Sequence, residues 1–173
     1  MTVFDLRPFP DPSVPCKSVT GDLTSVDSIT EAMRGHDVCF HTATFSPTGK
    51  NATSFGPMYK ASACHGQRPD APSLLRASVA HRPSLPPSCS QVNVVGTENV
   101  ILACQAVKCT RLVYTSSASV AWDGSDYKFV DESVPYPTRF HDFYSKTKML
   151  AEKLVLEANG QKGVQTGEGP DLL

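Results

Sequence analysis

The sequence lacks any long hydrophobic run, which excludes a helix that spans a membrane. Such a helix needs roughly 20 consecutive apolar residues, and no stretch of the 173 residues approaches that length. A secretory signal is missing as well, because Asp5 and Arg7 interrupt the short apolar stretch at the N-terminus. We therefore expect an intracellular chain that is soluble and cytoplasmic by itself.

An excess of charge of either sign is also absent. The chain has 16 basic and 17 acidic side chains, which give a formal net charge of −1. This balance provides no electrostatic footprint for nucleic acid or for an anionic membrane surface. We therefore expect neither of them as a partner.

The six cysteines lack the arrangement of metal ligands or redox pairs. No C-x-x-C pair occurs, and no cysteine and histidine cluster has the spacing of a zinc site. The five histidines show no ligand spacing either. We therefore expect reduced thiols, as is usual inside cells, and no bound metal.

The sequence does contain an alternation of strand-like and helix-like segments. Short apolar runs predict strands at 2–6, 37–43 and 111–116, and residues 18–20 give a weaker strand signal. Helical spacing of apolar residues predicts helices at 24–35, 91–108 and 143–159. We expect Thr24 to cap the first of these helices. Strands that alternate with helices indicate a parallel sheet with crossover helices, a doubly wound α/β fold.

Two segments depart from this alternation. Residues 47–90 are rich in proline and serine and show no sustained periodicity, which predicts a low-order, disordered insertion. Residues 164–173 are short, polar and unpatterned, which predicts a tail. The ordered fold is therefore expected in residues 1–46 and 91–163.

The sharpest chemical feature is a tyrosine and a lysine four residues apart in the helix at 143–159. At this spacing Tyr144 and Lys148 share one helix face. An ammonium beside a phenol favours the phenolate, so such a pair can accept a proton from a substrate hydroxyl. Upstream, Ser116 and Ser117 follow a buried strand, and ligands bind at the carboxyl ends of parallel strands.

Three other polar residues fit a dinucleotide site. Asp5 ends the first strand, where a carboxylate can accept hydrogen bonds from the ribose of an adenosine. Asp22 follows Gly21 and can contact an adenine edge, or it can simply form the turn. Asn93, in the helix at 91–108, can hold backbone carbonyls in register.

Taken together, these segments resemble an extended short-chain dehydrogenase/reductase. More closely the chain resembles the 3β-hydroxysteroid dehydrogenase/isomerase family, and within it the sterol-4α-carboxylate 3-dehydrogenases (decarboxylating). The resemblance covers residues 1–46 and 91–163 and rests on the runs at 3–8, 21–23, 38–43, 92–101, 111–117, 131–137, 144–148 and 154–160.

The resemblance implies roles for the candidate catalytic residues. Tyr144 is expected to be the catalytic acid/base, and Lys148 to assist it and to hold the nicotinamide ribose. Ser117 is expected to bind the substrate oxygen, with Ser116 as the alternative. The expected cofactor is NAD.

The resemblance also implies contacts to that cofactor. Asp5 is expected to bind the adenosine ribose, which favours NAD over NADP, and Asp22 to lie near the adenine. Thr42 and Ala43 are expected to line the cofactor path. Both catalytic residues of the helix, Tyr144 and Lys148, count as cofactor contacts too.

The activity implied by the resemblance is an NAD-dependent oxidation in steroid biosynthesis. The family oxidises a sterol 3β-hydroxyl to a ketone, and a carboxylate at C4 then leaves as carbon dioxide. The implied partner is a sterol, the implied location is the endoplasmic reticulum, and a homodimer is compatible with the family.

The sequence departs from the family in what it lacks. It has no G-x-x-G-x-x-G run, and it begins where the second strand of the family is expected. We therefore expect a truncated member with an incomplete Rossmann-like sheet, without the central first strand and the C-terminal strands. Either the flanking strands then pair directly, or the sheet stays split.

Two other functions stay open on the sequence alone. One is a catalytically inactive truncated isoform, or an aberrant gene product, that acts through a binding partner. The other is a different extended reductase, such as a nucleotide-sugar epimerase or a flavonoid reductase. Epimerases usually carry V-Y-G after the serines, whereas residues 119–124 read S-V-A-W-D-G, which favours the sterol branch.

Overall fold

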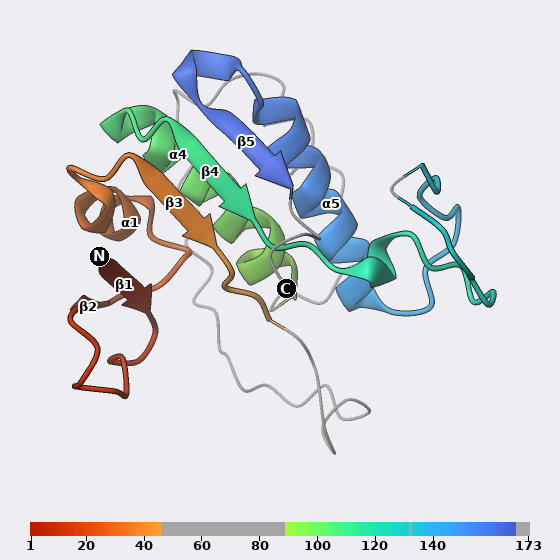
Figure 1. Cartoon of the computed structure of the whole chain (residues 1–173), viewed down its shortest axis with the longest axis horizontal. Helices are drawn as coiled ribbons and strands as arrows, with labels where there is room; N and C mark the ends of the chain where they lie inside the picture. Colours follow the sequence, from red (N-terminus) through yellow and green to blue (C-terminus); the bar gives the residue numbers. More distant parts are fainter. Residues whose placement is uncertain (46–88, 132, 169–173) are drawn as a thin grey trace.

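The computed structural model describes residues 1–45, 89–131 and 133–168 (Figure 1). The insertion predicted at 47–90 therefore lies outside the described residues, apart from Cys89 and Ser90. The described residues form parallel strands and crossover helices, so the α/β prediction is confirmed.

The N-terminal part forms a two-stranded parallel sheet. Strand β1 (Thr2–Asp5) pairs with strand β2 (Lys17–Thr20), with Thr2 opposite Lys17 and Asp5 opposite Thr20. After β2 the chain passes close to the first strand, because the Gly21 N–H donates to the Asp5 carbonyl at 2.9 Å. A Cβ atom at Gly21 would lie 2.5 Å from the Phe4 ring, so a larger residue here would displace that ring.

A second sheet contains three parallel strands in the order β3-β4-β5. These strands are β3 (Val38–His41), β4 (Arg111–Tyr114) and β5 (Gln165–Glu168). No strand pairing joins the two sheets within the described residues, so the sheet is split rather than closed. Of the two arrangements that the sequence left open, the split one is correct.

Strand β5 corrects the prediction that residues 164–173 form an unpatterned tail, because residues 165–168 form a strand. The strand begins where the Gln165 N–H donates to the Thr110 carbonyl at 2.7 Å. Val164, just before it, is buried. The residues of this strand are polar, so the sequence shows no hydrophobic alternation there. Backbone pairing with β4 specifies the strand instead.

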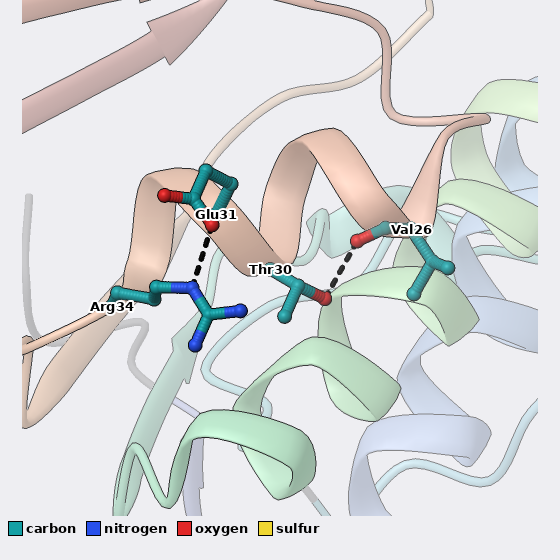
Figure 2. Close-up of polar contacts among 4 residues, drawn as sticks. All are labelled: Val26, Thr30, Glu31 and Arg34. Atoms are coloured by element: carbon teal, nitrogen blue, oxygen red, sulfur yellow. Dashed lines mark hydrogen bonds and ion pairs between the residues drawn. The ribbon is translucent and has the colours of Figure 1, made fainter.

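Helix α1 (Val26–Met33) lies beside the first sheet, and Ser25 caps it instead of the predicted Thr24. The Ser25 hydroxyl accepts the Ser28 N–H, whereas the Thr24 N–H is taken by the Asp22 carboxylate at 2.8 Å. Figure 2 shows how the helix satisfies its own polar groups. The Thr30 hydroxyl donates to the Val26 carbonyl at 2.6 Å, and Arg34 pairs with Glu31 at 2.6 Å.

Helices α4 (Gly96–Val107) and α5 (Phe143–Ala158) cover one face of the three-stranded sheet (Figure 1). A π-helical turn, Ser90–Val95, leads into α4. The Asp142 carboxylate caps α5 by accepting the Ser145 N–H at 2.7 Å. No described helix covers the other face of the sheet, where Phe40 of β3 is 65% exposed.

The hydrophobic core lies between these helices and the sheet. It joins Ile29 of α1, Ile101 of α4 and Leu154 of α5 to Leu112 and Tyr114 of β4. Full burial of a side chain of this size contributes about 1.5–3 kcal/mol. Helices α4 and α5 and strand β4 are therefore held together mainly by apolar contacts.

Helix α1 attaches the N-terminal sheet to this core. The Asn99 side chain of α4 donates to the Leu23 carbonyl at 2.8 Å, and a Cβ atom at Gly96 would lie 3.0 Å from the Leu23 side chain. After the C-terminal end of α1, the His36 ring forms a hydrogen bond with the Thr2 hydroxyl of β1 at 2.8 Å. The two sheets are thus connected through α1, although no strand joins them.

Among the helices that the structure describes, none combines the length and the apolar character needed to cross a bilayer.

Candidate active site

Helix α5 places Tyr144 and Lys148 one turn apart, as the sequence predicts. Lys148 is only 2% exposed, whereas Tyr144 is half-buried. The two side chains therefore differ in environment: one amine lies within the protein, and one phenol lies at its boundary.

The Lys148 side chain reaches from α5 to the carboxyl end of β4. Its Nζ donates to the Thr115 carbonyl at 2.5 Å and lies 4.3 Å from the centre of the Tyr114 ring. The carbonyl and the ring face both favour a cation. These contacts fix the ammonium at the edge of the sheet where ligands of parallel α/β folds bind.

Burial lowers the pKa of Lys148 from 10.5 to about 8, and the negative charge of Glu152 acts in the opposite direction. The amine is therefore mostly protonated at neutral pH. It titrates closer to neutrality than an exposed lysine does.

His41, the last residue of β3, packs against the same ring of Tyr114, with 5.5 Å between ring centres. The Thr97 hydroxyl donates to the Asn93 carbonyl at 2.7 Å, so it accepts the Nε2–H of His41 at 2.9 Å. Burial, and secondarily the charge of Lys148, lower the pKa of His41 to about 4. Hence His41 is neutral under Lys148 at physiological pH.

The two candidate serines have different partners. Ser116 donates its hydroxyl to the carboxylate of Glu152. Ser117 caps a short 3-10 helix, Ala118–Val120, and its Oγ lies 2.9 Å from the Ser119 hydroxyl. Both hydroxyls therefore have partners within the protein, a carboxylate for Ser116 and Ser119 for Ser117.

Asn93 holds the loop after β3 against helix α5. Its side-chain oxygen accepts the Phe45 N–H at 2.6 Å, and its amide donates to the Phe45 carbonyl at 2.9 Å and to the Thr147 hydroxyl at 3.0 Å. The prediction that Asn93 binds backbone groups is thus confirmed. The asparagine ties together two segments that border the candidate site.

Thr42 and Ala43 follow β3 at the same sheet edge as Ser116 and Ser117. The Thr115 N–H donates to the His41 carbonyl at 3.2 Å, which continues the pairing of β3 with β4 up to this edge. Thr42 is exposed and Ala43 is half-buried. The structure therefore brings these two residues to the same sheet edge as the serines, and Lys148 of α5 reaches this edge through the Thr115 carbonyl.

Asp5 and Asp22 lie at the carboxyl end of the separate β1-β2 sheet, and both are exposed. The Asp5 carboxylate accepts the Arg7 N–H at 3.0 Å, and the Asp22 carboxylate accepts the Thr24 N–H at 2.8 Å. Each acid thus organises its own turn. The split between the sheets separates them from the residues of α5 and β4.

Sequence reasoning missed Glu152 and Tyr136. The Tyr136 hydroxyl donates to Glu152 Oε1 at 2.6 Å, and the Glu152 side chain is buried. The missed signal was helical spacing, because Tyr144, Lys148 and Glu152 follow one another at four-residue intervals. This spacing places the Glu152 carboxylate on the same helix face as Tyr144 and Lys148, which makes it a candidate member of the site.

The sequence matches a known family. The model of the 3-beta hydroxysteroid dehydrogenase/isomerase family matches residues 76–168. This range includes α4, β4, α5 and β5, and it starts inside the segment 47–90 that we expect to lie outside the family resemblance.

Two curated relatives are similar to this chain over different lengths. A 3-beta-hydroxysteroid dehydrogenase of Mycolicibacterium neoaurum is 35% identical over 164 residues, which are 94% of this chain and 37% of the relative. The decarboxylating sterol-4-alpha-carboxylate 3-dehydrogenase of Schizosaccharomyces pombe is 52% identical over 71 residues, 41% of this chain and 21% of the relative. The chain thus spans well under half the length of these relatives.

Solved structures share the fold. The MoeE5 protein in complex with UDP-glucuronic acid and NAD superposes with a TM-score of 0.65, covering 97% of this chain and 44% of that chain at 22% sequence identity. At this identity the likeness establishes the Rossmann-like parallel fold. Given the match of the family model over more than half of the residues, the chain belongs to the 3-beta hydroxysteroid dehydrogenase/isomerase family.

Proposed function

We propose that Tyr144, Lys148 and Ser117 form the catalytic site of an NAD-dependent oxidoreductase that oxidises a sterol 3β-hydroxyl. One observation carries the proposal: the Lys148 ammonium is buried and fixed at the carboxyl end of β4, one helical turn from Tyr144. The proposal concerns the activity of the whole protein. This chain spans only part of the length of its relatives.

In this proposal Tyr144 accepts the proton of the substrate hydroxyl. The positive charge of Lys148, on the same helix face, stabilises the phenolate that this transfer needs. Ser117 donates a hydrogen bond to the substrate oxygen and orients it. Proton transfer by a positioned group of this kind accelerates a reaction by about 10²–10⁴-fold.

The described residues fit NAD in part. Asp5 offers an exposed carboxylate at the end of a parallel strand, which suits the two hydroxyls of an adenosine ribose, and Asp22 lies nearby for the adenine. Thr42, Ala43 and Lys148 suit the nicotinamide end. The sequence contains no G-x-x-G-x-x-G run for the pyrophosphate. When bound, NAD supplies the acceptor for the hydride that leaves C3 of the sterol.

The proposed substrate is a sterol with a carboxylate at C4. Oxidation of its 3β-hydroxyl gives a β-keto acid. The bond from C4 to the carboxylate then breaks, its electron pair moves towards the ketone, and carbon dioxide leaves. The relative of S. pombe, whose name states this decarboxylation, supports the choice, since it is 52% identical over the region it shares with this chain.

We propose the endoplasmic reticulum membrane as the place where the protein meets this substrate. A sterol is almost entirely apolar, so it partitions into membranes instead of water. Fractionation of cells that express the protein is expected to recover it with microsomes, and recovery in the cytosol alone would overturn this part of the proposal.

A second candidate is a catalytically inactive protein that acts through a binding partner. One observation favours it: no strand joins the two sheets in the described part of the chain. A protein of this kind would bind no dinucleotide, so the two candidates differ in a measurable property.

The test is an assay of the purified protein with NAD and a 4α-carboxy-3β-hydroxysterol. The proposal predicts NADH and carbon dioxide in equal amounts, and their loss in Tyr144→Phe. The same sterol without the carboxylate is expected to give NADH alone, and a UDP-sugar is expected to give neither. Absence of NADH with every substrate would support the inactive candidate.

A further inference from the structure

Glu152 occupies an unusual position for a carboxylate. It lies on α5 one turn beyond Lys148 and two turns beyond Tyr144, and it is 8% exposed. A charged group that leaves water loses several kcal/mol of hydration free energy unless hydrogen bonds replace it. The position of Glu152 therefore requires partners, and the structure supplies two.

Both partners come from loops that border the candidate site. Ser116, in the loop after β4, donates its hydroxyl to Glu152 Oε2. Tyr136, in the segment before α5, donates its hydroxyl to Oε1 at 2.6 Å. The two carboxylate oxygens thus fasten two separate loops to the helix that carries Tyr144 and Lys148. Since Ser117 is the next residue after Ser116, this contact also fixes where Ser117 begins its turn.

The charge of Glu152 acts on Lys148 as well. The ionisable group that faces Lys148 from β3 is His41, whose pKa is lowered by burial and by the charge of Lys148, so it is neutral and adds no second positive charge. Tyr114 of β4 offers the face of its ring, and Thr115 offers a carbonyl. Glu152 is the negative charge that counteracts the effect of burial on the Lys148 ammonium.

We propose that Glu152 is a positioning residue for the Tyr144–Lys148 pair: it anchors the Ser116–Ser117 loop and Tyr136 to α5, and it places a buried carboxylate one helical turn beyond Lys148 on the same helix. This inference rests on the proposed function, in which the Lys148 ammonium and Ser117 take part. It adds a second task to helix α5, which sets the geometry of the serine loop as well as that of the tyrosine and lysine.

Two substitutions separate the tasks. Glu152→Gln keeps a side chain of the same size with one oxygen and one NH₂ group, and both hydroxyl partners can accept as well as donate, so it keeps the anchor and removes the charge. Ser116→Ala keeps the charge and removes one anchor. Glu157→Gln, on the exposed face of the same helix, is the matched control.

The measurement is an NMR pH titration of the purified chain with isotope-labelled lysine side chains, the Lys148 signal being assigned by its loss in Lys148→Arg. Glu152→Gln is expected to lower the midpoint of Lys148 by about one pH unit or more. Glu157→Gln is expected to leave it unchanged. Because this readout needs no turnover, it tests the role of Glu152 even if the proposed activity fails.

A second readout tests the anchor. In the oxidation assay, Ser116→Ala is expected to lower kcat about tenfold or more with a smaller change in the KM for NAD, and with the Lys148 midpoint unchanged. Amide spectra identify folded variants, and only those are compared. A Lys148 midpoint that stays the same in folded Glu152→Gln would overturn the proposal, as would full activity of Ser116→Ala in a protein shown to be active.

Discussion

The Lys148 ammonium donates a hydrogen bond to the main-chain carbonyl of Thr115 at 2.5 Å, and this bond joins helix α5 to the end of strand β4. The lysine that the sequence pairs with Tyr144 is therefore also the link between helix and sheet. This double role leads to predictions in which stability and activity respond differently to one substitution.

Replacing Lys148 by methionine is expected to lower the oxidation rate strongly without loss of stability at neutral pH. Methionine fills similar space, and the burial of an ammonium costs desolvation free energy that the variant no longer bears. The oxidation rate is expected to fall about 100-fold or more, while urea unfolding gives an unchanged or larger free energy. The control Lys146→Met is expected to retain activity.

The same lysine predicts a pH dependence of stability. The pKa of Lys148 is about 8 in the folded protein against an ordinary value of 10.5. Between these values the unfolded chain holds the proton that the folded protein has released, so the unfolding free energy rises with pH over this range. Lys148→Met is expected to lack this rise. If both proteins show the same rise in urea titrations, Lys148 is not the group responsible.

Tyr144→Phe removes one hydroxyl at the boundary of the protein. We expect the oxidation rate to fall about 10²–10⁴-fold, since the group that accepts the substrate proton is lost. NAD binding and the melting temperature are expected to change little. Steady-state kinetics and a thermal melt check this, and a variant with half the wild-type rate would exclude Tyr144 as the acid/base.

His41 is expected to make the protein sensitive to acid. Its pKa is about 4 when folded and 6.5 ordinarily, so the unfolded chain takes up the proton first as the pH falls. This group contributes full stability above pH 6.5, and the contribution is lost as the pH falls to about 4, a change of about 3 kcal/mol. His41→Gln is expected to flatten this part of the stability profile in urea titrations, and an unchanged profile would show that His41 is not the group responsible.

Asn93→Ala is expected to loosen the loop after β3. The substitution removes the contacts to Phe45 and Thr147 that hold this loop to α5, at a cost of about 2–3 kcal/mol in unfolding free energy. Asn159→Ala removes one exposed hydrogen bond, to the Thr166 N–H, and is expected to cost less than about 1 kcal/mol. Equal losses in the two variants would contradict the role assigned to Asn93.

Much of this fold could be predicted from the sequence because the core elements carry a strong periodic signal. The strand of Leu112 and Tyr114 and the helix of Leu154 and Ala158 are apolar at the expected spacing, and all four residues are buried. The register of Tyr144 and Lys148 follows from helix geometry alone.

The rest could not be predicted because backbone pairing and tertiary contacts decide it. Strand β5 is polar, and only its pairing with β4 reveals it. The choice of Ser25 over Thr24 as the cap appears only in the hydrogen bond that the Ser28 N–H donates to the Ser25 hydroxyl. The partners of Glu152 come from residues 16 and 36 positions away, which no local pattern indicates.

The most direct test of the account is a calorimetric titration of the purified, monodisperse chain with NAD. The proposed cofactor site predicts saturable binding that weakens about tenfold or more in Asp5→Ala, which loses the carboxylate for the ribose, and that stays unchanged in Asp11→Ala on the neighbouring loop. Absence of saturable heat up to about millimolar NAD, or equal affinity of the Asp5→Ala variant, would contradict the cofactor site, although the family membership would stand.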